Sequence, residues 1–221
     1  MILEINHNSF KVIGSKPIEL NINFNYTNNE PLFETIKIED GKIYNLEFHQ
    51  ARVDRSYKEY YKIDSTINLK EYLKTPPLNG IYRAKLIYNK FGFVSLNYYK
   101  YSKKIIKKLA LVEIKNFEYS YKYLNRDSFN QLAKIADEVI ITQNGYLKDA
   151  TIANIALLDK KSKIWHTPQE PLLQGTSLQK HLEEKNITKE NIHYKDLKNY
   201  SKIALLNAMI DFYIISREKN G

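Results

Sequence analysis

Residues 121 to 126 read Tyr-Lys-Tyr-Leu-Asn-Arg and stand between a strand-like run and a helix expected from about residue 127 to residue 136. Lys122 is one of 29 lysines, and in isolation it would be interpreted as a solvated surface residue. Its setting changes that interpretation, because a lysine held partly out of water has a lowered pKa. The neutral amine can then form a Schiff base with a carbonyl compound. Lys122 is therefore the first candidate catalytic residue.

The chain before this segment predicts an α+β unit of about 100 residues. Alternating apolar residues indicate four strands in two hairpins, and helical spacing indicates one helix between the hairpins. The strands are expected at 32–38, 42–46, 81–88 and 93–99, and the helix at 49–61. Residues 76–80, Pro-Pro-Leu-Asn-Gly, have the composition of a loop.

The second half of the chain predicts a larger unit of strands and helices. Strands are expected at 109–114, 138–142, 152–158 and 163–166, and helices at 127–136 and 178–184, the second with Ser177 as a possible N-terminal cap. The apolar segment 205–215 fits either a core helix or a strand. The fold class predicted is α/β (α+β), with a smaller domain at 1–99, a basic connector at 100–108 and a larger domain at 109–221.

Composition argues against several kinds of site. The chain has no cysteine, which excludes disulfides and thiolate metal sites, and its five histidines never fall at zinc-ligand spacing, so no metal is expected. It contains no run of about 18 apolar residues, and polar residues interrupt the first ten positions. Neither a membrane span nor a signal peptide is expected, and we predict a cytoplasmic protein.

The net charge of +9 raises the possibility of a nucleic-acid-binding protein without catalytic activity. Only five of the 34 basic residues are arginine, however, and most lysines are interspersed with acidic residues. A solvated, lysine-rich surface is the preferred interpretation, so no nucleic-acid partner is expected. An anionic small-molecule substrate is compatible with this charge.

Seven short motifs between residues 32 and 210 occur in a fixed order. They are Phe33-Glu34-Thr35 with Gly41-Lys42, His49-Gln50-Ala51-Arg52, Lys122-Tyr123-Leu124-Asn125-Arg126, Asp137-Glu138 with Gly145, Asp149 and Asn154, Thr167-Pro168, Gly175-Thr176-Ser177, and Asn207-Ala208-Met209. Each motif alone is weak. Together their order resembles that of fold-type IV enzymes dependent on pyridoxal 5'-phosphate (PLP), namely the class IV aminotransferases and the 4-amino-4-deoxychorismate lyases.

The resemblance implies a role for several residues. Lys122 would be the Schiff-base lysine and then the proton shuttle. Asp149 would pair with the pyridine nitrogen, although it is otherwise read as a turn residue. Arg52, otherwise a surface helix residue, would bind the cofactor phosphate together with the backbone amides of Thr176 and Ser177 and the Ser177 hydroxyl. The residues that would orient either the cofactor or a neighbouring strand are Asn154 and Thr151.

The chain also departs from the family pattern. Asp149 replaces the usual glutamate and is shorter by one C–C bond of about 1.5 Å. Leu178 stands where an arginine is common, so other cations would bind the substrate carboxylates. The glycine-rich stretch expected before Phe33 is replaced by residues 25–31. The alternative substrate-binding cations are Arg83, Lys85 and Arg126.

The function that the resemblance implies is the conversion of 4-amino-4-deoxychorismate to 4-aminobenzoate and pyruvate, a folate-pathway reaction. A class IV aminotransferase acting on branched-chain or D-amino acids is the alternative, because it would share every cofactor contact. The implied fold is a two-domain, D-amino acid aminotransferase-like one, with PLP in the cleft between domains and a homodimeric assembly.

Overall fold

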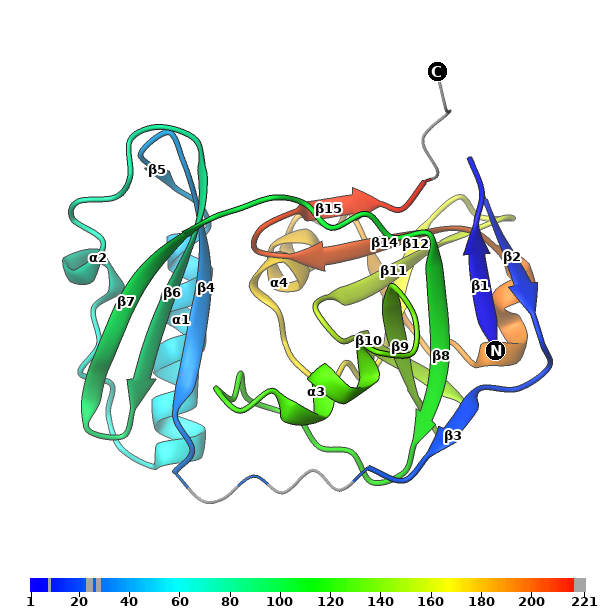
Figure 1. Ribbon diagram of the computed structural model, residues 1–221, viewed down its shortest axis with the longest axis horizontal. Coiled ribbons are helices and arrows are strands. Elements are labelled where there is room, and N and C mark those ends of the chain that lie inside the picture. The colour runs from blue at the N-terminus through cyan, green and yellow to red at the C-terminus, as the bar shows by residue number, and fades with distance from the viewer. Residues whose placement is uncertain (8, 23–25, 27–28, 217–221) are drawn as a thin grey trace. The chain divides into compact units, whose positions relative to one another are not determined.

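The computed structural model describes residues 1–7, 9–22, 26 and 29–216 (Figure 1). The chain forms two compact units. The larger unit comprises residues 1–24, 104–118 and 127–221, and the smaller unit comprises residues 25–103 and 119–126. Residues 25, 27 and 28 of the 25–31 stretch singled out in the sequence lie outside the described residues. No helix in the described part of the chain is long and apolar enough to span a membrane.

This division differs from the predicted domains at two places. The first residues join the larger unit because strand β1 (Ile2–Ile5) pairs with β8 (Lys108–Ile114). The segment around Lys122 joins the smaller unit because it continues the edge of its sheet: the Phe33 amide donates to the Lys122 carbonyl at 3.0 Å. Both pairings join residues far apart in the sequence, which local patterns do not reveal.

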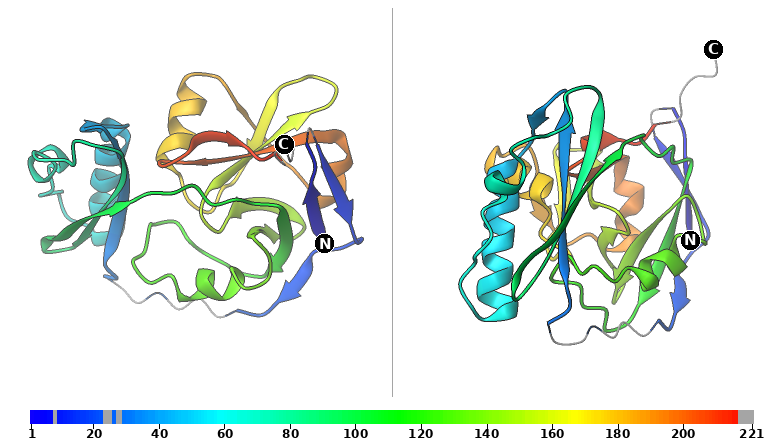
Figure 2. Two further views of the ribbon diagram at one scale, coloured as in Figure 1. Left: turned by 45° about the horizontal axis from the view of Figure 1, so that its top comes forward. Right: turned by 60° about the vertical axis from the view of Figure 1, so that its left-hand side comes forward.

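The smaller unit is one antiparallel sheet covered on one face by a helix (Figures 1 and 2). The strand order is β5-β4-β6-β7. The elements are β4 (Leu32–Glu39), β5 (Lys42–Ile43), α1 (Leu46–Ser56), the π-helical turn η1 (Tyr57–Tyr61), α2 (Leu69–Tyr72), β6 (Ile81–Asn89) and β7 (Gly92–Lys100). Both predicted hairpins are confirmed, and residues 76–80 form the expected loop. Strand β5 ends earlier than predicted because Leu46 already begins α1.

Side-chain alternation determines which face of this sheet is buried. Along β4, Leu32, Ile36 and Ile38 are fully buried, and along β6 Ala84 and Leu86 are fully buried. Alternate residues of a strand point to the same face. Glu34 has the same parity as Leu32 and Ile36, so its carboxylate lies on the buried side of the sheet, in contact with α1.

The larger unit contains two sheets (Figure 1). The first has the order β10-β9-β8-β1-β2 with β3 also paired to β8, and the second has the order β13-β12-β11-β14-β15. Their further strands are β2 (Phe10–Ile13), β3 (Ile18–Leu20), β9 (Glu138–Gln143), β10 (Tyr146–Ala150), β11 (Asn154–Asp159), β12 (Trp165–Pro168), β13 (Thr188–Glu190), β14 (Tyr200–Asn207) and β15 (Asp211–Ile214). One apolar core contains residues from both sheets, including Leu111, Ile140, Leu157 and Leu205.

The helices of the larger unit are α3 (Asp127–Leu132), α4 (Thr176–Glu183) and the 3-10 helix η2 (Tyr194–Asn199). Leu178 of α4 packs on Ala156 and Leu206, on the side of the second sheet opposite the main core. Helix α3 is shorter than predicted. The open choice for segment 205–215 resolves as two strands, because a turn before Asp211 reverses the chain. The N-cap of α4 is Gly175, and Ser177 lies within the helix.

Candidate active site

A buried charged cluster lies between β4 and α1 in the smaller unit. Helix α1 presents His49 and Arg52 at positions i and i+3, on the face that meets Glu34. The Arg52 Nε donates to Glu34 Oε1 at 2.8 Å, and its Nη2 donates to Glu34 Oε2 at 2.5 Å. The His49 Nδ1 lies 2.5 Å from the same Oε2. In this cluster Arg52 binds both oxygens of the Glu34 carboxylate side-on, and His49 contacts one of these oxygens, Oε2.

The charges in this cluster compensate one another. Burial alone would raise the pKa of Glu34, but the Arg52 charge and the His49 hydrogen bond outweigh it and hold the pKa at about 2. Burial lowers the pKa of His49, against the opposing hydrogen bond and charge of Glu34. His49 Nε2 is buried without a partner among the described residues, which fits a neutral imidazole. Glu34 and Arg52 therefore form an ion pair whose net charge is zero.

Lys122 has the properties expected of an amine that reacts in its neutral form. Its Nζ lies 4.7 Å from the centre of the Phe33 ring and makes no hydrogen bond or ion pair with any described residue. Burial, followed by the nearby charges of Arg52 and Arg126, lowers the pKa of Lys122 to about 7, although the charge of Glu34 opposes them. Near neutral pH a substantial fraction of this amine is uncharged.

The three cations proposed for substrate carboxylates all belong to the smaller unit. Arg83 and Lys85 share one face of β6, opposite the face that carries the buried Ala84 and Leu86. The Lys85 Nζ lies 5.1 Å from the Phe33 ring centre, so Lys85 and Lys122 contact the same ring. The charge of Arg83 also contributes to the lowered pKa of Lys122.

Arg126 is held by its own neighbours. Its Nη1 donates to the Tyr119 hydroxyl at 2.8 Å, and its guanidinium lies over the Tyr119 ring. It also contributes to the low pKa of Lys122. Arg126 therefore acts on the electrostatics of the amine, and a role in substrate binding remains a prediction.

The larger unit carries a second buried polar group, centred on Asp149. The pairing of β10 with β9 shifts register between Leu147 and Ala150, so Asp149 lies in an irregular part of the strand. Such bulges redirect side chains. The Asp149 Oδ1 accepts from Asn154 Nδ2 at 2.8 Å, and its Oδ2 accepts from the Leu173 amide at 2.9 Å. Burial raises the pKa of Asp149 to about 7, although both hydrogen bonds oppose that rise.

Asn154 links Asp149 to the segment that precedes α4. Its Nδ2 also donates to the Leu173 carbonyl at 2.8 Å. Its Oδ1 lies so close to Gly175 that a Cβ at this position would overlap the amide. The glycine of the Gly175-Thr176-Ser177 motif is thus required for close packing, and its φ is ordinary for any residue.

The first turn of α4 offers backbone amides for an anion. The Gly175 N-cap provides no side-chain hydrogen bond, and the amides of Thr176 and Ser177 donate to no described residue. Helix N-termini of this kind favour negative charge. These two amides are therefore available as hydrogen-bond donors for a phosphate, as their predicted role requires.

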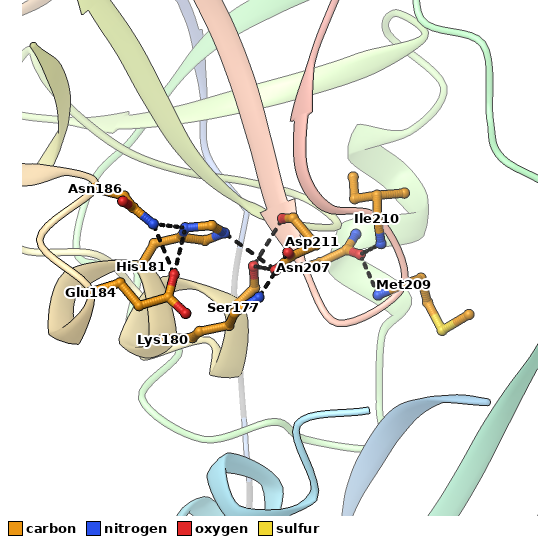
Figure 3. A network of polar contacts seen from close by, with 9 residues as sticks. All are labelled: Ser177, Lys180, His181, Glu184, Asn186, Asn207, Met209, Ile210 and Asp211. Carbon is orange, nitrogen blue, oxygen red and sulfur yellow. Dashed lines mark hydrogen bonds and ion pairs between the residues drawn. The ribbon is translucent and has the colours of Figure 1, made fainter. Parts of the chain in front are cut away.

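The Ser177 hydroxyl is already engaged by the C-terminal turn (Figure 3). It donates to Asp211, whose carbonyl lies 2.8 Å and whose Oδ1 lies 3.1 Å away. Lys180 and His181 also contact the Asp211 carboxylate, at 2.9 Å and 3.2 Å. Asp211 has a φ of 53°, which is unusual for a residue with a side chain. The hydroxyl therefore fastens α4 to the β14–β15 turn, and the backbone amides remain for a ligand.

Two other motif residues have structural partners. The Thr151 hydroxyl and amide both donate to Glu138, so Thr151 fixes the turn after Asp149. Leu178 is fully buried in the core beneath α4 and cannot replace an anion-binding arginine. Glu34 and His49 belong to the motifs found in the sequence, but no role was predicted for either residue. Asp211 was not among the predicted site residues. The signal for Asp211 was its charge within an otherwise apolar C-terminal segment.

Comparison with known proteins decides the family. The model of the amino-transferase class IV family matches residues 78–217, more than half of the chain. The chain belongs to the class IV aminotransferase family. It is therefore a PLP-dependent enzyme of fold-type IV, and the predicted fold class is confirmed.

Relatives of this family member include proteins with close and distant sequences. A Haemophilus influenzae protein described as uncharacterized is 38% identical over 187 residues, which cover 81% of this chain and 97% of that protein. The crystal structure of a candidate 4-amino-4-deoxychorismate lyase from Haemophilus somnus 129PT is 33% identical, with a TM-score of 0.72, and covers 81% of this chain and 96% of that one. A hypothetical aminotransferase of Mycobacterium tuberculosis in its PLP-bound form shares the fold, with a TM-score of 0.65 over 97% of this chain and 90% of that one, at 13% identity.

The residues of this class IV family member fit the cofactor. A PLP molecule needs an amine, donors for a phosphate and a carboxylate for its pyridine nitrogen. Lys122 supplies an amine of low pKa. The α4 amides and the remaining N–H groups of Arg52 supply donors. Asp149 supplies a buried carboxylate with no ion-pair partner among the described residues.

Proposed function

We propose that this enzyme is a lyase that converts 4-amino-4-deoxychorismate to 4-aminobenzoate and pyruvate. The observation that carries the proposal is the likeness to the Haemophilus somnus structure, which extends over nearly the whole of that chain at 33% identity. The short Leu124-Asn125-Arg126 sequence after the lysine and the Asn207-Ala208-Met209 motif also favour the lyase. A place in the folate pathway follows from the reaction and is part of the proposal.

When bound, PLP supplies an aldehyde that captures the substrate amine and an electron sink for the carbon beside it. Lys122 is the residue that moves protons. Its Nζ takes the proton from ring carbon C4 of the substrate and returns a proton to the departing three-carbon group. A pKa of about 7 suits both transfers, because the amine gains and loses a proton at little cost near neutral pH.

The other residues bind and orient. Arg52 and the amides of Thr176 and Ser177 would hold the cofactor phosphate, and Asp149 would hold the protonated pyridine nitrogen. A cationic nitrogen beside Asp149 would favour its ionised form and so reverse the effect of burial on its pKa. Asn154 would keep the Asp149 carboxylate and the segment before α4 in register, because it donates to both.

The substrate carries two carboxylates, and cations of the smaller unit are proposed to bind them. Lys85 is the first of these, because it contacts the same Phe33 ring as Lys122. Arg83 and Arg126 are the others. Binding of the cofactor between the domains and assembly as a homodimer, both implied by the family resemblance, remain predictions.

One coupled assay tests the reaction. The purified enzyme is supplied with chorismate, glutamine and an aminodeoxychorismate synthase, and 4-aminobenzoate and pyruvate are measured together with a Lys122→Ala control. Equal amounts of both products, absent from the control, would support the lyase. Amino transfer from branched-chain or D-amino acids to a 2-oxo acid, without 4-aminobenzoate, would assign the aminotransferase activity instead.

A further inference from the structure

Glu34 lies behind Arg52 and is sealed from solvent. The side chain of Arg52 is 7% exposed, whereas those of Glu34 and His49 are 0% exposed. Of the three, only Arg52 has a surface that a ligand could touch. Any contribution of Glu34 to ligand binding must therefore pass through the arginine.

The geometry of the pair fixes the guanidinium. Glu34 engages Nε and Nη2 of Arg52 side-on with its two oxygens, at 2.8 Å and 2.5 Å. Two parallel hydrogen bonds define the plane of the fork and prevent its rotation. Nη1 donates to no described residue, so its two N–H groups remain for an external acceptor. His49 holds Oε2 from a third direction and keeps the carboxylate from turning.

We propose that Glu34 is a positioning residue that preorganises Arg52 for the cofactor phosphate. This inference rests on the proposed role of Arg52 as a phosphate ligand. In the protein without cofactor, Glu34 compensates the buried arginine charge and holds its fork in one orientation. The phosphate then meets an arginine that has already lost its conformational freedom, so less of the binding energy is spent on ordering it.

A purely structural role for Glu34 predicts a different result. The pair also joins β4 to α1, and its loss would disturb the packing of the smaller unit. Such a disturbance would weaken every ligand of the site to a similar extent. If Glu34 only positions Arg52, its loss should weaken the binding of ligands that carry a phosphate and of no others. The ratio of the affinities for PLP and for pyridoxal, which has the aldehyde and ring but no phosphate, separates the two roles.

The experiment measures dissociation constants of both ligands with the cofactor-free protein by absorbance or fluorescence titration. The variants are Glu34→Gln, Glu34→Asp and the double variant Glu34→Gln/Arg52→Ala, which removes both charges and leaves neither buried alone. The matched control is Glu39→Gln, which makes the same change on the same strand but at a partly exposed ion pair with Lys37.

Loss of a charge-assisted contact corresponds to about 10- to 150-fold in affinity. The double variant should lower the PLP-to-pyridoxal ratio by about that factor, and Glu34→Gln should lower it by roughly fivefold or more. Glu34→Asp, which keeps the charge but withdraws the carboxylate, should also lower the ratio and serves if Glu34→Gln does not fold. The ratio in Glu39→Gln should equal that of the wild type.

Two results would overturn the inference in different ways. If the double variant lowers the ratio but Glu34→Gln and Glu34→Asp do not, Arg52 binds the phosphate without help from Glu34. If the double variant leaves the ratio unchanged, Arg52 is not a phosphate ligand, and the proposed role and the inference fail together.

Discussion

Each of the two units buries one carboxylate of interest, Glu34 in the smaller unit and Asp149 in the larger, and the pKa values of these carboxylates shift in opposite directions. Glu34 of the smaller unit has its pKa held at about 2, because Arg52 and His49 outweigh the effect of burial. Asp149 of the larger unit has its pKa raised to about 7 by burial, which its neutral hydrogen-bond donors and the charge of Lys148 oppose but do not outweigh. Glu34 is fully buried and Asp149 is 5% exposed, so exposure does not explain the difference.

The difference lies in whether the protein supplies the counter-ion itself. Glu34 is paired with a cation of its own chain and is complete before any ligand binds. Asp149 has hydrogen bonds but no ion pair with a described residue, since the nearby Lys148 pairs with Glu170, and this is the arrangement expected of a carboxylate that receives its cation from a ligand. This difference is consistent with the proposed roles, a preparatory one for Glu34 and a direct cofactor contact for Asp149.

The largest expected effect concerns Lys122, the proposed Schiff-base residue and proton carrier. Lys122→Ala should lower the rate of 4-aminobenzoate formation by at least about 100- to 10,000-fold, because a positioned acid–base group is lost. PLP retention should fall much less, because the phosphate contacts remain. Borohydride treatment of the wild type, followed by peptide mass spectrometry, should place the cofactor on the peptide that contains Lys122. A cofactor adduct on another lysine, or an active Lys122→Ala enzyme, would contradict the assignment.

The next largest effect is expected on turnover when the charge of Asp149 is removed. Asp149→Asn keeps the volume but removes the charge, so PLP should still bind while turnover falls by roughly 100-fold or more. Spectroscopic titration with PLP would measure cofactor binding, and steady-state assays on the same preparation would measure turnover. Glu170→Gln is a suitable control, because Glu170 pairs with the neighbouring Lys148 at the surface. Near-normal turnover in Asp149→Asn would show that this carboxylate is not the partner of the pyridine nitrogen.

On the Glu34 side, the first expected effect is on stability. Arg52→Ala leaves Glu34 buried without its cation, and breaking such a pair costs about 3 to 5 kcal/mol in the free energy of unfolding. Urea denaturation of the cofactor-free protein would measure this loss. Arg55→Ala on the same helix, where Arg55 has no ion pair with any described residue, should change stability by less than about 0.5 kcal/mol. Equal stability of the two variants would show that the pair with Glu34 is not energetically important.

The two carboxylates should also respond to pH with opposite signs. The pKa of Glu34 is lowered from 4.5 to about 2, so its contribution to stability is full above about pH 4.5 and is lost as pH falls through about 2. The pKa of Asp149 is raised from 3.8 to about 7, so stability should decrease as pH rises from about 4 to about 7, by an amount on the order of a few kcal/mol.

Urea unfolding of the cofactor-free protein between about pH 2 and pH 7 measures how stability changes with pH, and so tests the direction predicted for each carboxylate. The decrease between about pH 4 and pH 7 should disappear in Asp149→Asn. Lys122, whose pKa is lowered from 10.5 to about 7, should add a rise in stability between these values, and Lys122→Met should abolish it. A decrease that persists unchanged in Asp149→Asn would assign it to another group.

The smallest expected effect concerns Ser177. Its hydroxyl contacts Asp211, so Ser177→Ala should cost about 1 kcal/mol in stability, while PLP affinity should change by less than about threefold because the backbone amides remain. Thermal unfolding and PLP titration would measure the two effects. Thr176→Val, beside it in the same turn, provides the comparison. A large loss of PLP affinity with unchanged stability would return the hydroxyl to the phosphate site.

The amino-acid sequence by itself determined the family and indicated the candidate reactive groups. Motif order was sufficient to select Lys122, Arg52 and Asp149, because the chemistry of PLP requires an amine, a phosphate donor and a carboxylate in one chain. Alternation and turn composition also predicted both hairpins of the smaller unit, since the side-chain period of a strand is a local property. The hairpins depend only on neighbouring residues, and the order of the motifs can be read along the chain without knowing their contacts.

Only the tertiary structure decided which residues the reactive groups meet. The segment that contains Lys122 belongs to the smaller unit, because the Lys122 carbonyl accepts a hydrogen bond from the Phe33 amide. The Ser177 hydroxyl donates a hydrogen bond to Asp211. The tertiary structure also gave opposite environments to Glu34 and Asp149, which the sequence does not reveal. The physical reason is that burial and charge pairing depend on residues far apart in the sequence, 18 positions for Glu34 and Arg52 and 34 positions for Ser177 and Asp211, and no local pattern encodes such contacts.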